Sequence, residues 1–182
     1  MTARRAAAAL LALLVLAELG ACASGTPASP DEIARRSEPV GIAADLVYVA
    51  DVDGFSLAVG SVGPYADEGM SAIWTRPRGD GLQLVTLLTS RVPEPGLPPC
   101  AELADAVELR CTVPVDGAAQ VVLAGEGVDA DTLRAVAETV RVPSPDDLAR
   151  LFADVRAPEG PVERGDLTPG DGAPDNSVGV GG

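Results

Sequence analysis

Short apolar segments separated by turn residues fill the middle of the chain. Each has the length of a β-strand and is rich in valine, leucine and threonine, with glycine, aspartate or proline between segments. Strands joined by such short turns pair antiparallel, because parallel neighbours need long crossovers. The pattern therefore predicts an antiparallel sheet of about five to six strands, arranged as a meander. The segments are 46–50, 55–59, 71–75, 82–90, 107–113 and 120–124. A Gly-Pro break is expected at 63–64, and a hairpin loop is expected over 77–81.

The period of the apolar positions changes after residue 130. Apolar residues recur at helical spacing over 131–140 and again over 148–155. Ser144 stands before Pro145 and two aspartates, an order typical of a helix N-terminus. The sequence thus predicts two C-terminal amphipathic helices packed on the sheet, and the fold class is α+β.

The first residues carry the pattern of an export signal. Two arginines at 4–5 precede an apolar run over 6–17, which is shorter than the roughly 20 residues that span a bilayer. Glu18 ends the run, and a charge at this point disfavours a permanent transmembrane helix. We therefore expect export followed by cleavage.

The residues at 19–22, LGAC, resemble the lipobox of bacterial lipoproteins. The resemblance implies that the thiol of Cys22 receives a diacylglyceryl group and that cleavage falls between Ala21 and Cys22. It also implies acylation of the new amino group, for instance with palmitate, and a lipid anchor on the extracytoplasmic side of the cell membrane. The alternative is ordinary secretion with cleavage after Ala21 or Ala23. The resemblance covers residues 1–22, and with the composition it is similar to small lipoproteins of actinobacterial type.

Four regions follow from these patterns. We expect a signal peptide at 1–21, a lipidated cysteine and tether at 22–38, a globular α+β domain at 39–156 and a disordered acidic tail at 157–182. Small residues dominate the tether, in which Ser29 and Pro30 are suited to start a short helix. The tail is rich in glycine, proline and aspartate and has almost no large apolar residue.

Two cysteines, Cys100 and Cys111, are left once Cys22 is set aside for lipid. An even pair in an exported domain predicts a disulfide. A redox pair or a metal site is the alternative, but the chain has no CxxC motif and no histidine to complete a metal cage.

Charge and composition exclude several functions. The chain has a net charge of -14, with 13 arginines, no lysine and no histidine. An acidic surface is repelled by nucleic acid, so we expect no nucleic-acid partner. Without histidine there is no Ser-His-Asp or Cys-His site, and without lysine there is no Walker A motif. No glycine pattern fits a phosphate-binding loop, so no cofactor is expected. Because there is no histidine to complete a metal cage, no metal is expected either.

The acidic residues offer two weaker candidates. Asp51 and Asp53 before Gly54 are similar to the start of a calcium loop, but Val62 occupies the position where an EF-hand needs an acid, so a hairpin turn is favoured. Glu102 and Asp105 would share one face if their segment were helical. Paired carboxylates can cleave glycosides if they meet in a cleft.

The sequence favours a lipid-anchored cell-envelope protein with a non-catalytic binding or structural role. Its partner would be another envelope protein or a lipid-like ligand. Two alternatives stay open: a carrier that encloses the lipid-like ligand between sheet and helices, and a carboxylate-based hydrolase.

Overall fold

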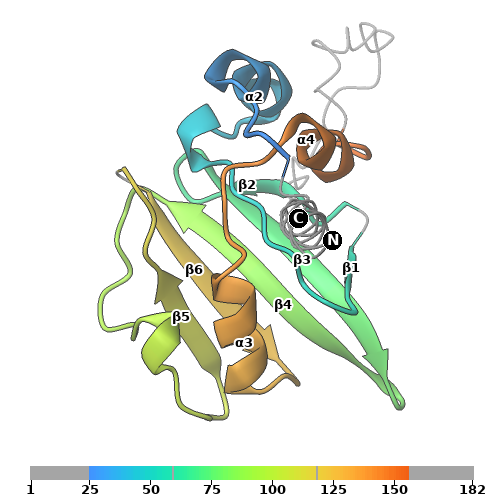
Figure 1. Ribbon diagram of the computed structural model, residues 1–182, viewed down its shortest axis with the longest axis vertical. Coiled ribbons are helices and arrows are strands. Elements are labelled where there is room, and N and C mark those ends of the chain that lie inside the picture. Colours follow the sequence, from blue (N-terminus) through green and yellow to red (C-terminus); the bar gives the residue numbers. More distant parts are fainter. Residues whose placement is uncertain (1–24, 59, 118, 156–182) are drawn as a thin grey trace, which may run out of the picture.

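Six strands form one antiparallel sheet in the order β1-β3-β4-β6-β5, with β2 also paired to β3 (Figure 1). The structure, a computed structural model, describes residues 25–58, 60–117 and 119–155. The expected signal peptide, the expected lipidation site Cys22 and the expected disordered tail lie outside these residues. The strands are β1 (Ser56–Leu57), β2 (Gly63–Tyr65), β3 (Gly69–Arg78), β4 (Gly81–Ser90), β5 (Leu109–Val113) and β6 (Gln120–Glu126).

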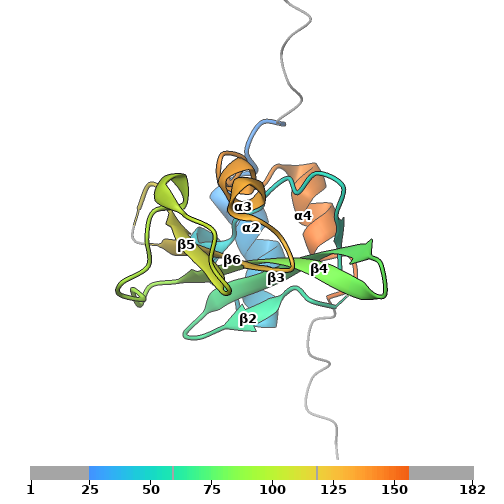
Figure 2. The ribbon, with the colours of Figure 1, turned by 90° about the horizontal axis from the view of Figure 1, so that it is seen from below.

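Among the described residues, two α-helices follow the sheet and one precedes it, so the fold is α+β. They are α2 (Pro30–Ser37), α3 (Ala130–Ala137) and α4 (Pro145–Leu151), joined by the short 3-10 turns η2 (Glu38–Val40), η3 (Ala44–Leu46) and η4 (Cys100–Glu102). Figure 2 shows α3 and α4 on one side of the sheet.

The space between sheet and helices is filled with aliphatic side chains. Met70, Val85, Leu87 and Leu123 point inward from the sheet and are almost completely buried, as are Leu133 of α3 and Leu148 of α4. Side chains in such interiors pack as densely as organic crystals. These buried side chains hold the helices on the sheet.

The longest strands form one hairpin. β3 and β4 pair from Ser71↔Leu88 to Arg78↔Gly81. Gly79 and Asp80 make the turn between them, and Gly79 has φ +57°, a left-handed conformation that glycine adopts without strain. The turn expected within 77–81 is confirmed.

The expected meander is wrong for the last two strands. β6 lies between β4 and β5, so β5 forms the edge of the sheet. The burial patterns give the reason. Val121, Val122 and Leu123 of β6 are buried consecutively, as in a central strand covered on both faces, whereas β5 alternates buried and half-buried residues.

Several strands differ from the predictions. β3 is longer than the expected 71–75, and β5 begins at Leu109 instead of residue 107. The segment 46–50 is not a strand: all five residues are buried, but only Val49 pairs with another segment, at Arg141. The strand expected over 55–59 is reduced to β1, Ser56–Leu57. Gly63 and Pro64, expected to be a break, belong to β2, which lies beside the end of β3. Proline is tolerated there because β2 pairs on one side only.

Helix α2 lies in the segment that the sequence assigned to the tether. Ser29 caps it by accepting the N–H of Glu32 at 3.3 Å, and Pro30 occupies the first turn. Ala28 and Ile33 are buried in the hydrophobic core. The packed part of the chain thus begins before residue 39.

Candidate functional site

A groove of about 730 Å³ opens to solvent where α2, the η2 and η3 turns, the end of β4 and the β5–β6 connection meet. Its apolar lining comes from Ile33, Ile42, Val47 and Val142. Val142 is 41% exposed, whereas Ile42 and Val47 are almost completely buried. Concave, partly apolar surfaces of this size are the usual places where proteins bind ligands or peptide segments.

Charged groups line the same groove. Arg91, just after β4, pairs with Asp45 of η3 at 2.6 Å and with Glu68 of the β2–β3 turn at 3.4 Å. All three side chains are substantially exposed, so these pairs add little to stability. Glu38 and Asp116 add two more carboxylates to the lining. Four acids against one arginine make the groove negative.

Tyr48 adds a hydroxyl group to the lining of the groove. Its hydroxyl donates to the carbonyl oxygen of Asp116 at 3.4 Å. Burial raises the pKa of Tyr48, and the nearby charges of Asp45 and Asp116 raise it further. The phenol therefore stays protonated and acts as a hydrogen-bond donor.

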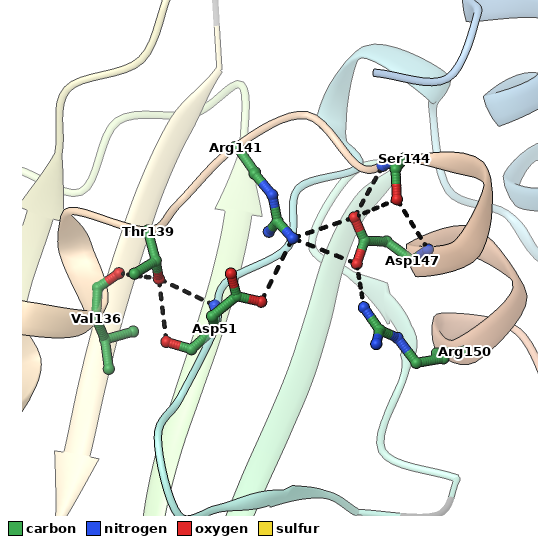
Figure 3. A network of polar contacts seen from close by, with 7 residues as sticks. All are labelled: Asp51, Val136, Thr139, Arg141, Ser144, Asp147 and Arg150. Atoms are coloured by element: carbon green, nitrogen blue, oxygen red, sulfur yellow. Dashed lines mark hydrogen bonds and ion pairs between the residues drawn. The ribbon is translucent and has the colours of Figure 1, made fainter. Parts of the chain in front are cut away.

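A network of polar contacts fixes the segment that forms one wall of the groove (Figure 3). Nη2 of Arg141 lies 3.4 Å from Oδ1 of Asp51 and 3.3 Å from Oδ2 of Asp147. Thr139 accepts the N–H of Asp51 at 2.9 Å and donates to a backbone carbonyl of α3, that of Val136, at 2.7 Å. These contacts hold residues 139–142 against the 49–51 segment and so place Val142.

Asp147 is the buried centre of this network. Its Oδ2 accepts the N–H of Ser144 at 2.9 Å and the hydroxyl of Ser144 at 2.8 Å, and its Oδ1 accepts from Arg150. Burial alone would raise the pKa of Asp147, but the hydrogen bonds from Ser144 and Arg150 and the charge of Arg141 outweigh it and lower the pKa. The carboxylate is therefore ionised and fully occupied.

The guanidinium of Arg141 is only partly satisfied. Nε and Nη1 are buried and have no hydrogen-bond partner among the described residues. Its side chain also contacts a shallow pocket of about 390 Å³ that shares Tyr48, Asp116 and Val142 with the groove.

The structure brings together one pair of residues that the sequence singled out. Cys100 in η4 and Cys111 in β5 lie at disulfide distance, with sulfur atoms 2.16 Å apart. The bond ties the loop before β5 to the sheet edge, where the N–H of Thr112 donates to the carbonyl oxygen of Pro98 at 2.9 Å. Cys22 and Ala21 lie outside the described residues.

The acidic candidates separate. Asp51–Gly54 forms a turn, in which Phe55 donates its N–H to Val52 at 3.0 Å and Gly54 has φ +73°. Asp105 accepts the N–H of Ala130 at 3.0 Å and so supports the start of α3, while Glu102 lies in η4. No joint site forms from Glu102 and Asp105.

Sequence reasoning missed the residues of the groove. Asp45 and Tyr48 lie on one segment and Arg91 and Asp116 on two others, and the four carry no shared motif. Only their long-range packing joins them. One signal was available: an uninterrupted apolar run at 46–50 that the structure buries without placing it in the sheet.

Comparisons with protein-family models, curated proteins and solved structures found no match to this chain. In the described part of the chain, histidine, cysteine, aspartate and glutamate side chains form no group of three or more that could hold a metal ion. None of the helices over 25–155 has both the length and the apolar character needed to span a membrane.

Proposed function

We propose that the chain is an exported lipoprotein, anchored by lipid at Cys22 on the extracytoplasmic side of the cell membrane, whose body is a non-catalytic binding module. The observation that carries the binding role is the solvent-open groove, which combines an apolar lining with charged side chains. The groove is the contact surface for another envelope protein.

The charges of the groove indicate the kind of partner. Glu38, Asp45, Glu68 and Asp116 outnumber Arg91, so a partner segment that carries arginine or lysine beside apolar side chains complements it. A second copy of this chain is disfavoured as the occupant, because the copies would repel each other: the whole chain has a net charge of -14, and the proposed cleavage removes Arg4, Arg5 and Glu18 and so makes it more negative.

A carrier role has less support. In this proposal α3 and α4 act as the two amphipathic helices that the sequence predicts, with Leu133 and Leu148 closing the inner face of the sheet. A lipid-like ligand between sheet and helices would have to displace side chains that are fully buried.

A carboxylate hydrolase also has less support. A second groove, of about 500 Å³ between residues 49–55 and α4, contains Asp51 and Asp147. A general acid needs a raised pKa, but the pKa of Asp147 is lowered and its oxygens are already bound by Ser144 and arginines.

The lipid anchor is tested first. Cys22→Ala and, as the control, Ala23→Ser are expressed with the native chain in an actinobacterial host. The native chain and Ala23→Ser should carry the mass of the attached lipid and enter the detergent phase on phase separation, while Cys22→Ala should do neither. Native protein in the aqueous phase with no added mass would refute lipid anchoring.

The binding role is tested by photocrosslinking in living cells. A photoreactive phenylalanine replaces Val142, which lines the groove, or Val107, a fully exposed control residue outside it. We expect an adduct of defined mass from position 142 only, and its loss when Asp45→Asn and Glu68→Gln are added. Identical adducts from both positions, or an adduct that is insensitive to these charges, would contradict a role for the groove.

A further inference from the structure

The N-terminal segment Gly25–Ala28 is held on the body instead of leading away from it. The N–H of Ala28 donates to the carbonyl oxygen of Pro143 at 2.8 Å, and Ala28 is 7% exposed. Gly25 approaches Ser144 so closely that a methyl group at residue 25 would lie 3.1 Å from its Cβ. The segment therefore follows the connection between α3 and α4 as part of the packed structure.

This docking shortens the link to the proposed lipid. Only three peptide units separate the Cα atoms of Cys22 and Gly25, and an extended chain covers at most about 11 Å over that length. The headgroup layer on one side of a bilayer is itself about 5–7 Å thick. With Cys22 at the membrane, about 5 Å is left between the headgroups and Gly25.

The end of the body that faces the membrane follows from the same contacts. Gly25 and Ser144 lie where α2 and α4 begin, and Figure 1 shows these two helices at one end of the molecule and the β3–β4 turn at the other. Pro30 and Val142, close in sequence to Ala28 and Pro143, line the groove. The groove thus lies at the same end as the attachment point.

We propose that the lipid on Cys22 holds the body directly against the headgroup layer, with the α2–α4 end toward the bilayer, so that the groove meets its partner at the membrane surface. This inference rests on the proposed lipid anchor. In this arrangement a link of three residues joins the lipid to the packed body, in place of the long flexible tether expected over 22–38. The α2–α4 end is the interaction surface, and it contacts a phospholipid bilayer.

Fluorescence quenching in vesicles tests this orientation. The lipidated, full mature protein is reconstituted in phosphatidylcholine vesicles that contain a lipid with a spin label on its headgroup. A fluorophore is placed on an introduced cysteine by Asp31→Cys, at the start of α2, or by the matched control Asp80→Cys, in the β3–β4 turn; both native side chains are exposed. We expect strong quenching at position 31 and almost none at position 80.

Lengthening the link provides the second arm. Ten glycine and serine residues inserted after Ala23 should reduce the quenching at position 31 to the value at position 80, because the body can then leave the surface. Equal quenching at the two positions with the native link, or strong quenching at 31 that survives the insertion, would overturn the orientation. Flotation of the same vesicles tests the lipid anchor separately: protein that does not float with lipid refutes the anchor and this inference together.

Discussion

Ser144 and Asp147 cap the start of α4 reciprocally. The carboxylate of Asp147 accepts the N–H and the hydroxyl of Ser144, and the Ser144 oxygen accepts the N–H of Asp147 at 3.2 Å. This capping box satisfies two backbone donors at a helix end. Gly25 packs on Ser144, and Arg141 binds Asp147. The capping box therefore also positions the N-terminal segment and one wall of the groove.

Replacement of Asp147 by asparagine should destabilise the fold by about 2–4 kcal/mol. The carboxylate is 1% exposed, and its loss leaves the partly buried Arg141 with the exposed Asp51 as its remaining counter-charge. Asp146→Asn is the matched control, because Asp146 is the exposed neighbour in the same helical turn, and it should cost less than about 1 kcal/mol. Urea unfolding of the three proteins measures the difference; equal midpoints for both variants would contradict the structural role of Asp147.

Acid should remove this contribution of Asp147. Its pKa is lowered in the folded state, because hydrogen bonds from Ser144 and Arg150 and the charge of Arg141 outweigh the effect of burial. The stabilisation is therefore fully present above the unfolded value of about 3.9 and is lost as pH falls below that value toward the folded pKa. The stability difference between native protein and Asp147→Asn, measured by urea unfolding, should shrink between pH 7 and pH 3. A difference that grows on acidification would show that the sign is wrong.

The sequence predicted those features of the fold that depend on a few neighbouring residues. Ser144 before Pro145 predicted the start of α4, and the glycine and aspartate within 77–81 predicted the β3–β4 turn. The pair Cys100 and Cys111 followed from counting the cysteines that remain after Cys22. Each of these features depends on a few neighbouring residues or on a single residue type.

Long-range packing decided what the sequence did not predict. The run at 46–50 has the composition of a strand, but its backbone groups find hydrogen-bond partners outside the sheet. Val49 exchanges two backbone hydrogen bonds with Arg141, and the hydroxyl of Thr89 donates to the carbonyl oxygen of Leu46 at 2.7 Å. The position of β6 between β4 and β5 likewise depends on long-range pairing between strands and not on a local signal. The groove depends on both, which is why none of its residues was predicted.

Removal of the disulfide should cost about 3 kcal/mol. Cys100 and Cys111 are 11 residues apart, and closing a loop of that length reduces the entropy of the unfolded chain by that order. The double variant Cys100→Ser with Cys111→Ser should therefore unfold at lower urea concentration than the oxidised native protein. Titration of free thiols in the denatured Cys22→Ala protein, whose remaining cysteines are Cys100 and Cys111, should find none; a positive count, or an unchanged midpoint, would contradict the bond.

Gly69 and Gly63 provide a matched test of the β2–β3–β4 packing. A methyl group at Gly69 would lie 1.9 Å from the carbonyl oxygen of Thr89 and 2.6 Å from that of Tyr65, and both are backbone atoms that cannot rotate away. At Gly63, in the paired strand β2, the same methyl group meets nothing within 4 Å. Gly69→Ala should therefore cost about 3 kcal/mol or more, since the strands must separate.

Gly63→Ala, in contrast, should change stability by less than about 1 kcal/mol, because the methyl group meets no neighbour and alanine reduces the freedom of the unfolded chain. Urea unfolding compares the two variants, and circular dichroism checks that the sheet still forms. Similar midpoints for Gly69→Ala and Gly63→Ala would show that β3 does not approach Thr89 this closely.

The close approach is significant for the groove, because Thr89 binds the carbonyl oxygen of Leu46, the last residue of η3, next to Val47 in the groove lining. Gly69→Ala should therefore also weaken the charge-dependent adduct from position 142, whereas Gly63→Ala should leave it intact.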